Sequence, residues 1–245
     1  EQNRPSKQIP RGRIHIGLVG EPGTGKSVMM EGLQRDFDAE YLTQDTKKSS
    51  LKGDARRSDM GVQIFQRGHG GIICFDEIEL MADIDREGSL RDVMESGYVK
   101  IAKGGREIIY PSQIRIIVGS NSFNKFSDAL IDRLDFIFRF NIPTSEESKE
   151  IAKRVTAIYA GQKWNEEIGL IQNYIRFCRE YTPQIGMDEL GKIEKYWEKY
   201  FDRDTGRTGR WIAKVLRIAF SLARLRHGNV TVKDIDIAAK MIKQN

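Results

Sequence analysis

The residues best suited to chemistry lie near the start of the chain, in the stretch GEPGTGKS from Gly20 to Ser27. The stretch fits the pattern G-x-x-x-x-G-K-[ST], which cradles nucleotide phosphates where a strand leads into a helix. Backbone N–H groups of the loop and the positive end of the helix dipole then point at the phosphates. Lys26 would reach the β- and γ-phosphates, and Ser27 would place its hydroxyl on Mg²⁺. The remaining expected nucleotide contacts are Glu21, Pro22, Gly23, Thr24 and Gly25.

Two strand-like runs further along end in polar side chains. GIICFDEIELM, residues 71–81, ends its apolar run in Asp76 and Glu77. Beside a phosphate loop, Asp76 would hold the Mg²⁺ water shell, and Glu77 would orient and deprotonate the attacking water. IRIIVGSN, residues 114–121, ends in Asn121, which would hydrogen-bond the γ-phosphate or that water. The alternative for Asn121 is an ordinary turn-forming residue.

Two arginines are candidates for a catalytic role across a subunit boundary. Arg133 comes just before the apolar run DFIF, residues 135–138. A guanidinium there does not easily reach the nucleotide of its own subunit if the phosphate loop lies across the sheet, so it suits an arginine finger offered to a neighbour. The alternative is a surface ion pair with Asp135. Arg210, which opens RWIAKVLRIAF, is a similar case.

A β-hairpin is predicted between the two polar strand ends. GYVKIAKGGREIIY, residues 97–110, alternates apolar and polar residues on either side of KGGR, whose glycines can take positive φ. Lys103 lies at or beside the tip. A lysine there is often only a solubilising residue. A hairpin inserted between two nucleotide-sensing strands is nevertheless well placed to move with the nucleotide state.

The elements that must position these residues change character near Pro143. Before it, short strand-like runs alternate with polar helices and turns, as in IHIGLV, GIICF, IRIIVG and FIFRF, which is typical of a parallel sheet covered by helices. After it, apolar residues recur at helical spacing, and TVKD, residues 231–234, predicts a capping box that opens a last helix. We therefore expect an α/β nucleotide-binding core over residues 1–142 and a smaller helical lid over residues 143–245.

The amino-acid composition excludes several classes of protein and of site. The 245 residues are 31% charged with a net charge of +5, and no apolar run reaches membrane length. We expect a cytoplasmic protein with no membrane partner. Its small net positive charge is compatible with binding to nucleic acid. Cys74 and Cys178 are isolated, so a disulfide framework and a CxxC zinc site are excluded. The scattered histidines are interpreted as structural: His15, His69 and His227.

The order of these parts resembles the AAA+ motor domain of the minichromosome maintenance (MCM) replicative helicases, as an archaeal-like member or a small relative. The resemblance covers almost the whole chain. The stretches that carry it are RGRIHIGLVGEPGTGKS, GGIICFDEIELM, MESGYVKIAKGGREI, VGSN, LIDRLDFIF, NYIRFCREYTPQI and GRWIAKVLRIAFSLARLR. The KIAKGG hairpin and the YIRFCRE helix are its most specific parts.

The resemblance implies a hexameric ring that binds Mg-ATP between subunits and acts on DNA, in association with the nucleoid. Lys26, Ser27, Asp76, Glu77 and Asn121 would act from one side of the interface, and Arg133 and Arg210 from the other. Lys103 falls on the family's pre-sensor hairpin lysine, which faces DNA in the central channel.

The expected function is an ATP-driven DNA translocase or helicase. One departure keeps an alternative open: the segment from Ser49 to Gly70 is shorter than the family's second hairpin insertion. A nucleotide-dependent scaffold or regulator that binds DNA or protein without unwinding is the main alternative. An AAA+ protein remodeller is a more distant one, because its pore would usually present an aromatic residue rather than AKGG.

Overall fold

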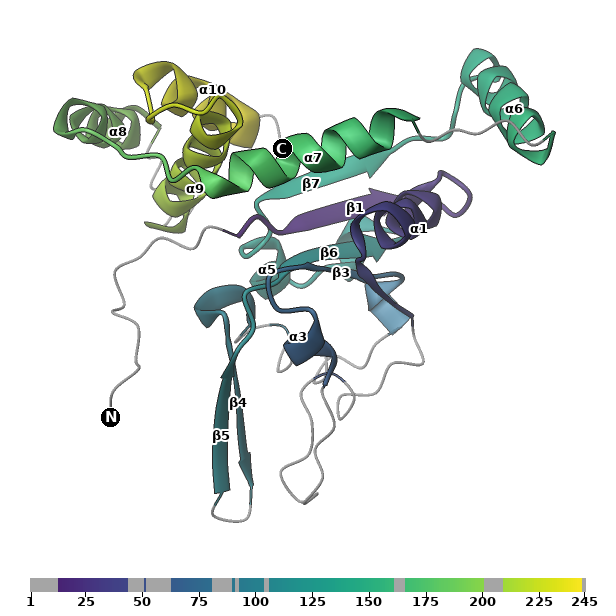
Figure 1. Ribbon diagram of the computed structural model, residues 1–245, viewed down its shortest axis with the longest axis horizontal. Coiled ribbons are helices and arrows are strands. Elements are labelled where there is room, and N and C mark those ends of the chain that lie inside the picture. Colours follow the sequence, from purple (N-terminus) through teal and green to yellow (C-terminus); the bar gives the residue numbers. More distant parts are fainter. Residues whose placement is uncertain are drawn as a thin grey trace. The chain divides into compact units, whose positions relative to one another are not determined.

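The computed structural model describes residues 13–43, 51, 63–80, 90, 93–103, 106–160, 166–200 and 209–243 (Figure 1). It contains two compact units, one over His15–Phe177 and one that holds Cys178–Asn245. The units divide inside a helix, whereas the sequence pattern changes near Pro143. Residue 143 therefore stays our proposed start of the lid, defined by the change from strands to helices.

A five-stranded parallel sheet forms the centre of the first unit, in the order β2-β3-β6-β1-β7 (Figure 1). Its strands are β1 (Ile16–Gly20), β2 (Glu40–Leu42), β3 (Ile72–Phe75), β6 (Arg115–Ser120) and β7 (Phe136–Phe140). The four apolar runs of the sequence supply β1, β3, β6 and β7. The fifth strand, β2, has only three residues, too few for an alternating pattern to reveal it.

Alternation along the strands builds a core on each face of the sheet. Leu18, Cys74 and Ile117 belong to one buried cluster together with Met30 of helix α1 (Lys26–Phe37). Their strand neighbours Val19, Phe75 and Val118 face the other way, into a larger cluster. That cluster also includes Phe65 of α3 (Ile64–Arg67) and Leu130 of α5 (Asp128–Ile131). Helices thus cover both faces, which confirms the predicted AAA+ type of α/β fold.

The predicted hairpin is present as a separate two-stranded ribbon, β4 (Tyr98–Lys103) and β5 (Arg106–Pro111) (Figure 1). Its antiparallel register runs from Tyr98 opposite Pro111 to Lys103 opposite Arg106. At the root, the Ser112 N–H donates to the carbonyl of Gly97 at 2.7 Å. Val99 and Tyr110 pack into the larger core cluster, so the hairpin is anchored in the body of the unit.

Two short 3-10 turns follow the strands that end in polar residues, η1 (Ile78–Leu80) after β3 and η2 (Phe123–Lys125) after β6. The described elements after β7 are all helices, as the spacing of apolar residues predicts: α6 (Ser145–Tyr159), α7 (Glu166–Glu180), α8 (Met187–Tyr200), α9 (Gly209–Leu225) and α10 (Val232–Lys243). Among the described helices, we find none with the length and apolarity that crossing a bilayer requires.

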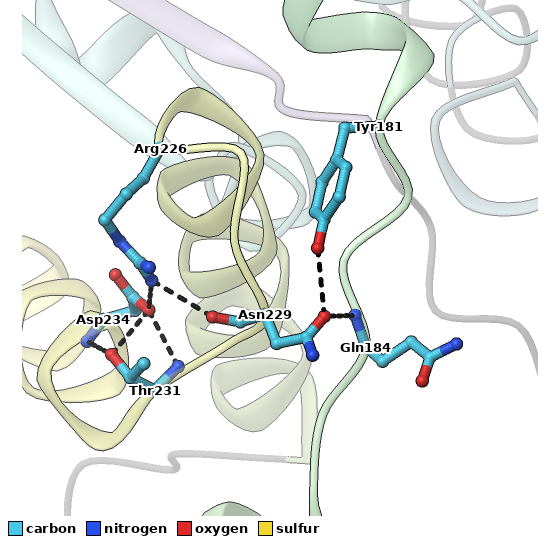
Figure 2. Close-up of polar contacts among 6 residues, drawn as sticks. All are labelled: Tyr181, Gln184, Arg226, Asn229, Thr231 and Asp234. Carbon is cyan, nitrogen blue, oxygen red and sulfur yellow. Dashed lines mark hydrogen bonds and ion pairs between the residues drawn. The ribbon is translucent and has the colours of Figure 1, made fainter.

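The expected capping box opens α10 (Figure 2). Asp234 Oδ2 accepts hydrogen bonds from the Thr231 N–H at 2.8 Å and the Thr231 hydroxyl at 2.7 Å, and Arg226 Nη2 also donates to it. Burial alone would raise the pKa of Asp234, but these hydrogen bonds outweigh it and the pKa is lowered. In the adjoining loop, Asn229 Oδ1 accepts hydrogen bonds from the Tyr181 hydroxyl and the Gln184 N–H.

Candidate active site

The glycine loop connects β1 to α1, as the motif requires. Gly25, the residue before α1, has φ of 96°, in the left-handed region that favours glycine. Lys26 is only 4% exposed. Its ammonium donates to the carbonyls of Gly20 at 2.6 Å and Glu21 at 3.0 Å. The loop therefore wraps a positive charge at the N-terminus of a helix, an arrangement that suits phosphate.

Asp76 lies directly after β3, where its carboxylate is held by three donors. Oδ2 accepts hydrogen bonds from the hydroxyls of Ser27 at 2.7 Å and Tyr41 at 2.6 Å. Oδ1 accepts the N–H of Glu77 at 3.0 Å. The neighbouring strand β6 leaves room for it because position 119 is glycine, and a Cβ there would lie 3.1 Å from Oδ1.

This hydroxyl and carboxylate pair fits Mg²⁺. An ionised carboxylate only accepts hydrogen bonds, so the Ser27 hydroxyl donates and its lone pairs stay available to a cation. Mg²⁺ takes oxygen ligands and usually combines one or two protein groups with waters and substrate phosphates. The structure thus brings together Ser27 and Asp76, the two residues that sequence alone assigned to the metal.

The other two predicted residues at this edge, Glu77 and Asn121, also meet. The Asn121 amide donates to Glu77 Oε1 at 3.4 Å, and the Asn121 N–H donates to Glu79 Oε1 at 2.9 Å. Glu77 has φ of 49°, a left-handed conformation that costs a non-glycine residue about 1–3 kcal/mol and is common at functional sites. Since β6 lies between β3 and β1, Asn121 occupies the strand end between the carboxylates and the glycine loop.

Arg133 lies just before β7 begins, at the amino ends of the strands, whereas the residues above lie at the carboxyl ends. Its guanidinium pairs with Glu95 Oε1 at 2.5 Å and also donates to the carbonyl of Ala129. The Arg133 side chain is 8% exposed and that of Glu95 33%. Asp135, the partner that the sequence suggested, is buried and accepts a hydrogen bond from the His15 N–H at 2.9 Å. The observed ion pair joins Arg133 to the segment just before the hairpin.

The last two predicted residues, Lys103 and Arg210, belong to the hairpin and to helix α9. Lys103 and Arg106 form the final register pair of the hairpin before its turn, so Lys103 is beside the tip as predicted. Arg210 is in the first turn of α9, in the second unit, and its side chain is partly buried. Within the first unit, the structure therefore brings together Lys26, Ser27, Asp76, Glu77 and Asn121, and leaves Arg133 and Lys103 apart from them.

Three residues at these sites were missed by sequence reasoning: Tyr41, Glu79 and Glu95. Burial first, and then its bond to Asp76, raises the pKa of Tyr41, which keeps the phenol protonated as a donor. A usable signal existed for Tyr41, because the strand after a phosphate-loop helix commonly joins the same parallel sheet. No sequence signal identifies which carboxylate will meet Asn121 or Arg133.

The histidines and Cys74 fill structural positions. His15 Nδ1 accepts the N–H of Ile116 and His69 Nδ1 accepts that of Gln113, each at 3.1 Å. The ring of His227 packs 5.0 Å from that of Tyr181. Burial, with a smaller contribution from the charge of Asp76, raises the pKa of the Cys74 thiol to about 12, so Cys74 is not a reactive nucleophile.

Comparison with known proteins agrees with this geometry. The family model described as the MCM P-loop domain matches residues 1–159. The curated relatives include the minichromosome maintenance protein MCM of Saccharolobus solfataricus, 26% identical over 267 residues that cover 95% of this chain and 38% of that protein. The DNA replication licensing factor mcm7 of Schizosaccharomyces pombe is 24% identical over 274 residues, covering 95% of this chain and 36% of that protein.

A third relative, the DNA replication licensing factor MCM5 of Arabidopsis thaliana, is 24% identical over 274 residues, covering 94% of this chain and 38% of that protein. The chain thus spans a little over a third of the length of the curated relatives it matches. The match includes every site residue before position 160, and the relatives extend it across the helical part.

Proposed function

This chain belongs to the MCM family of P-loop proteins, and on that premise we propose that it is an ATP-driven motor that translocates along DNA or unwinds it. One observation carries the proposal: three adjacent strand ends gather a lysine, a serine, two acids and an amide at a single edge of the sheet. Phosphoryl transfer needs this combination, because its catalysis consists almost wholly of positioning and charge stabilisation.

Each residue at this edge has a role in the proposed hydrolysis. Lys26 binds the β- and γ-phosphates, while Ser27 and Asp76 hold Mg²⁺, which would neutralise charge on the phosphate oxygens. Glu77 accepts the proton of the attacking water. Asn121 orients that water or the γ-phosphate, and its contact with Glu77 supports this assignment.

The remaining catalytic charge is proposed to come from a neighbouring subunit. Arg133 precedes β7 at the amino edge of a parallel sheet, whereas the phosphate loop follows β1 at the carboxyl edge. The two are separated by the length of a strand, about 16 Å for five residues. We therefore propose that Arg133 acts on the nucleotide of an adjacent subunit in a ring, in the manner of an arginine finger. For Arg210 we propose the same role, on the MCM family match alone.

The proposed DNA contact is the β4–β5 hairpin. It lies in the chain between the strand that carries Asp76 and the strand that carries Asn121, and its second strand leads directly into β6. Lys103, beside its tip, would contact a backbone phosphate, which fixes position without reading sequence. Self-association into a hexamer would present several such lysines to one DNA strand, in the cytoplasm at the nucleoid.

The test is the ATPase rate with and without single-stranded DNA at one salt concentration, because phosphate contacts make affinity depend on salt. We expect DNA to stimulate hydrolysis. A strand-displacement assay then separates a motor from a scaffold, which would bind DNA but leave the duplex intact. An ATPase rate that DNA does not change would contradict the motor and favour a protein remodeller.

A further inference from the structure

The carboxylate of Asp76 is held by a side chain that neither the motif nor the family match assigns. Tyr41 lies in β2, at the edge of the sheet beside β3, and its hydroxyl donates to Asp76 Oδ2 at 2.6 Å. The same oxygen accepts the Ser27 hydroxyl at 2.7 Å. Two hydroxyls from two different elements therefore converge on one carboxylate oxygen.

The two hydroxyls differ in how firmly they are held. Ser27 lies at the start of α1, and its hydroxyl can rotate about a single bond. The partly buried ring of Tyr41 packs against the core cluster that contains Met30 and Cys74. A packed aromatic ring has little rotational freedom, so the phenol is the more rigid donor. When the Ser27 oxygen coordinates a cation, the Tyr41 hydroxyl would still hold the Asp76 carboxylate in its orientation.

We propose that Tyr41 is a positioning residue for the metal: its hydroxyl orients Asp76 and thereby sets the affinity of the nucleotide site for Mg²⁺. The inference rests on the proposed function, since it needs a Mg-nucleotide site at Asp76. Partners that orient a metal-binding carboxylate typically change metal affinity or activity by about 10- to 100-fold when they are removed.

Tyr41→Phe tests the proposal because it removes one oxygen and leaves the ring in the core. The experiment titrates Mg²⁺ into the chain with a fluorescent ATP analogue and follows binding, with parallel titrations in EDTA to measure affinity without the metal. We expect the half-saturating Mg²⁺ concentration to rise about 10-fold or more in Tyr41→Phe. We expect the affinity in EDTA to stay within about 2-fold, because Tyr41 contacts Asp76 rather than the phosphate loop.

The matched control is Tyr181→Phe, which also removes a phenol hydroxyl, here one that donates to Asn229 Oδ1 at 3.3 Å in the second unit. It should titrate with Mg²⁺ like the parent. If turnover is measured as well, excess Mg²⁺ should restore the rate of Tyr41→Phe, which a loosened core would not permit.

The outcomes separate the two claims. A half-saturating Mg²⁺ concentration in Tyr41→Phe equal to or below that of the parent overturns the positioning role. A loss of affinity that is equal in EDTA and in Mg²⁺ overturns it too, because that result reports a general structural defect. If binding of the ATP analogue to the parent chain does not depend on Mg²⁺, that result contradicts the proposed function and also the inference that rests on it.

Discussion

Replacing Arg133 tests whether one guanidinium serves both the fold and catalysis. In the structure this side chain is 8% exposed and is paired with Glu95 at 2.5 Å. A hydrogen bond between charged groups contributes about 1.5–3 kcal/mol net. Breaking a fully buried pair costs about 3–5 kcal/mol. Since Glu95 keeps a third of its exposure and can be rehydrated, we expect Arg133→Ala to lose about 1–3 kcal/mol of unfolding free energy.

That loss corresponds to a fall in melting temperature of about 2–4 °C for each kcal/mol in a chain of this size. The catalytic effect should be much larger than the structural one. Removing an arginine finger lowers hydrolysis by roughly 10³-fold or more, while nucleotide affinity should stay within a few-fold. Calorimetry, nucleotide binding and steady-state ATPase on the same preparation measure the three quantities.

Arg133→Lys separates the two roles. A lysine keeps a cation near Glu95 and should recover part of the stability, but it lacks the planar fork and should leave hydrolysis low. Mixing Arg133→Ala with Lys26→Ala subunits should restore some activity, because hybrid interfaces then combine one intact half from each. Parental hydrolysis in Arg133→Ala, or no recovery in mixtures shown to co-assemble, would refute an arginine finger acting in trans.

Two further predictions concern the phosphate loop and the last helix. Lys26→Ala should lose ATP binding, whereas Glu77→Gln should bind ATP and lose turnover, since only the second residue serves the attacking water; normal turnover in Glu77→Gln would remove it from the base role. The lowered pKa of Asp234 means that its stabilising effect is present above the pKa of the unfolded chain and is lost as pH falls through the folded value. Acid unfolding followed by circular dichroism should therefore show a weaker pH dependence in Asp234→Asn, and an unchanged profile would contradict the assignment.

Much of the fold was predictable because its signals are local. The apolar runs of β1, β3, β6 and β7 and the periodicity of the later helices each lie within a few consecutive residues. Parallel strands place their carboxyl ends at one side of the sheet, so Asp76 after β3 and Asn121 after β6 lie on the same side as the phosphate loop after β1. The capping box at Thr231 was readable for the same reason, since both of its members lie within one helical turn.

The contacts that escaped prediction join residues far apart in the sequence. Tyr41 is 35 positions from Asp76, and Glu95 is 38 positions from Arg133. Neither pairing follows from residue type, because each depends on which elements the finished fold places side by side. The sequence suggested Asp135 for Arg133 on proximity alone, and that carboxylate instead lies buried where the backbone of His15 reaches it.

The contribution of Lys103 to DNA binding tests the motor proposal most directly, with Lys100 as a matched control. Both lysines belong to β4, but Lys103 is in the last register pair before the turn, opposite Arg106, whereas Lys100 is paired three positions earlier, opposite Ile109. The measurement is single-stranded DNA affinity against salt concentration, together with DNA stimulation of the ATPase, for the parent, Lys103→Ala and Lys100→Ala. The account predicts that Lys103→Ala binds all sequences more weakly, lowers the salt slope by about one contact per engaged subunit and loses stimulation, while Lys100→Ala behaves like the parent. An unchanged slope and full stimulation in Lys103→Ala, or an equal loss in both variants, would contradict a motor that grips DNA through this hairpin tip.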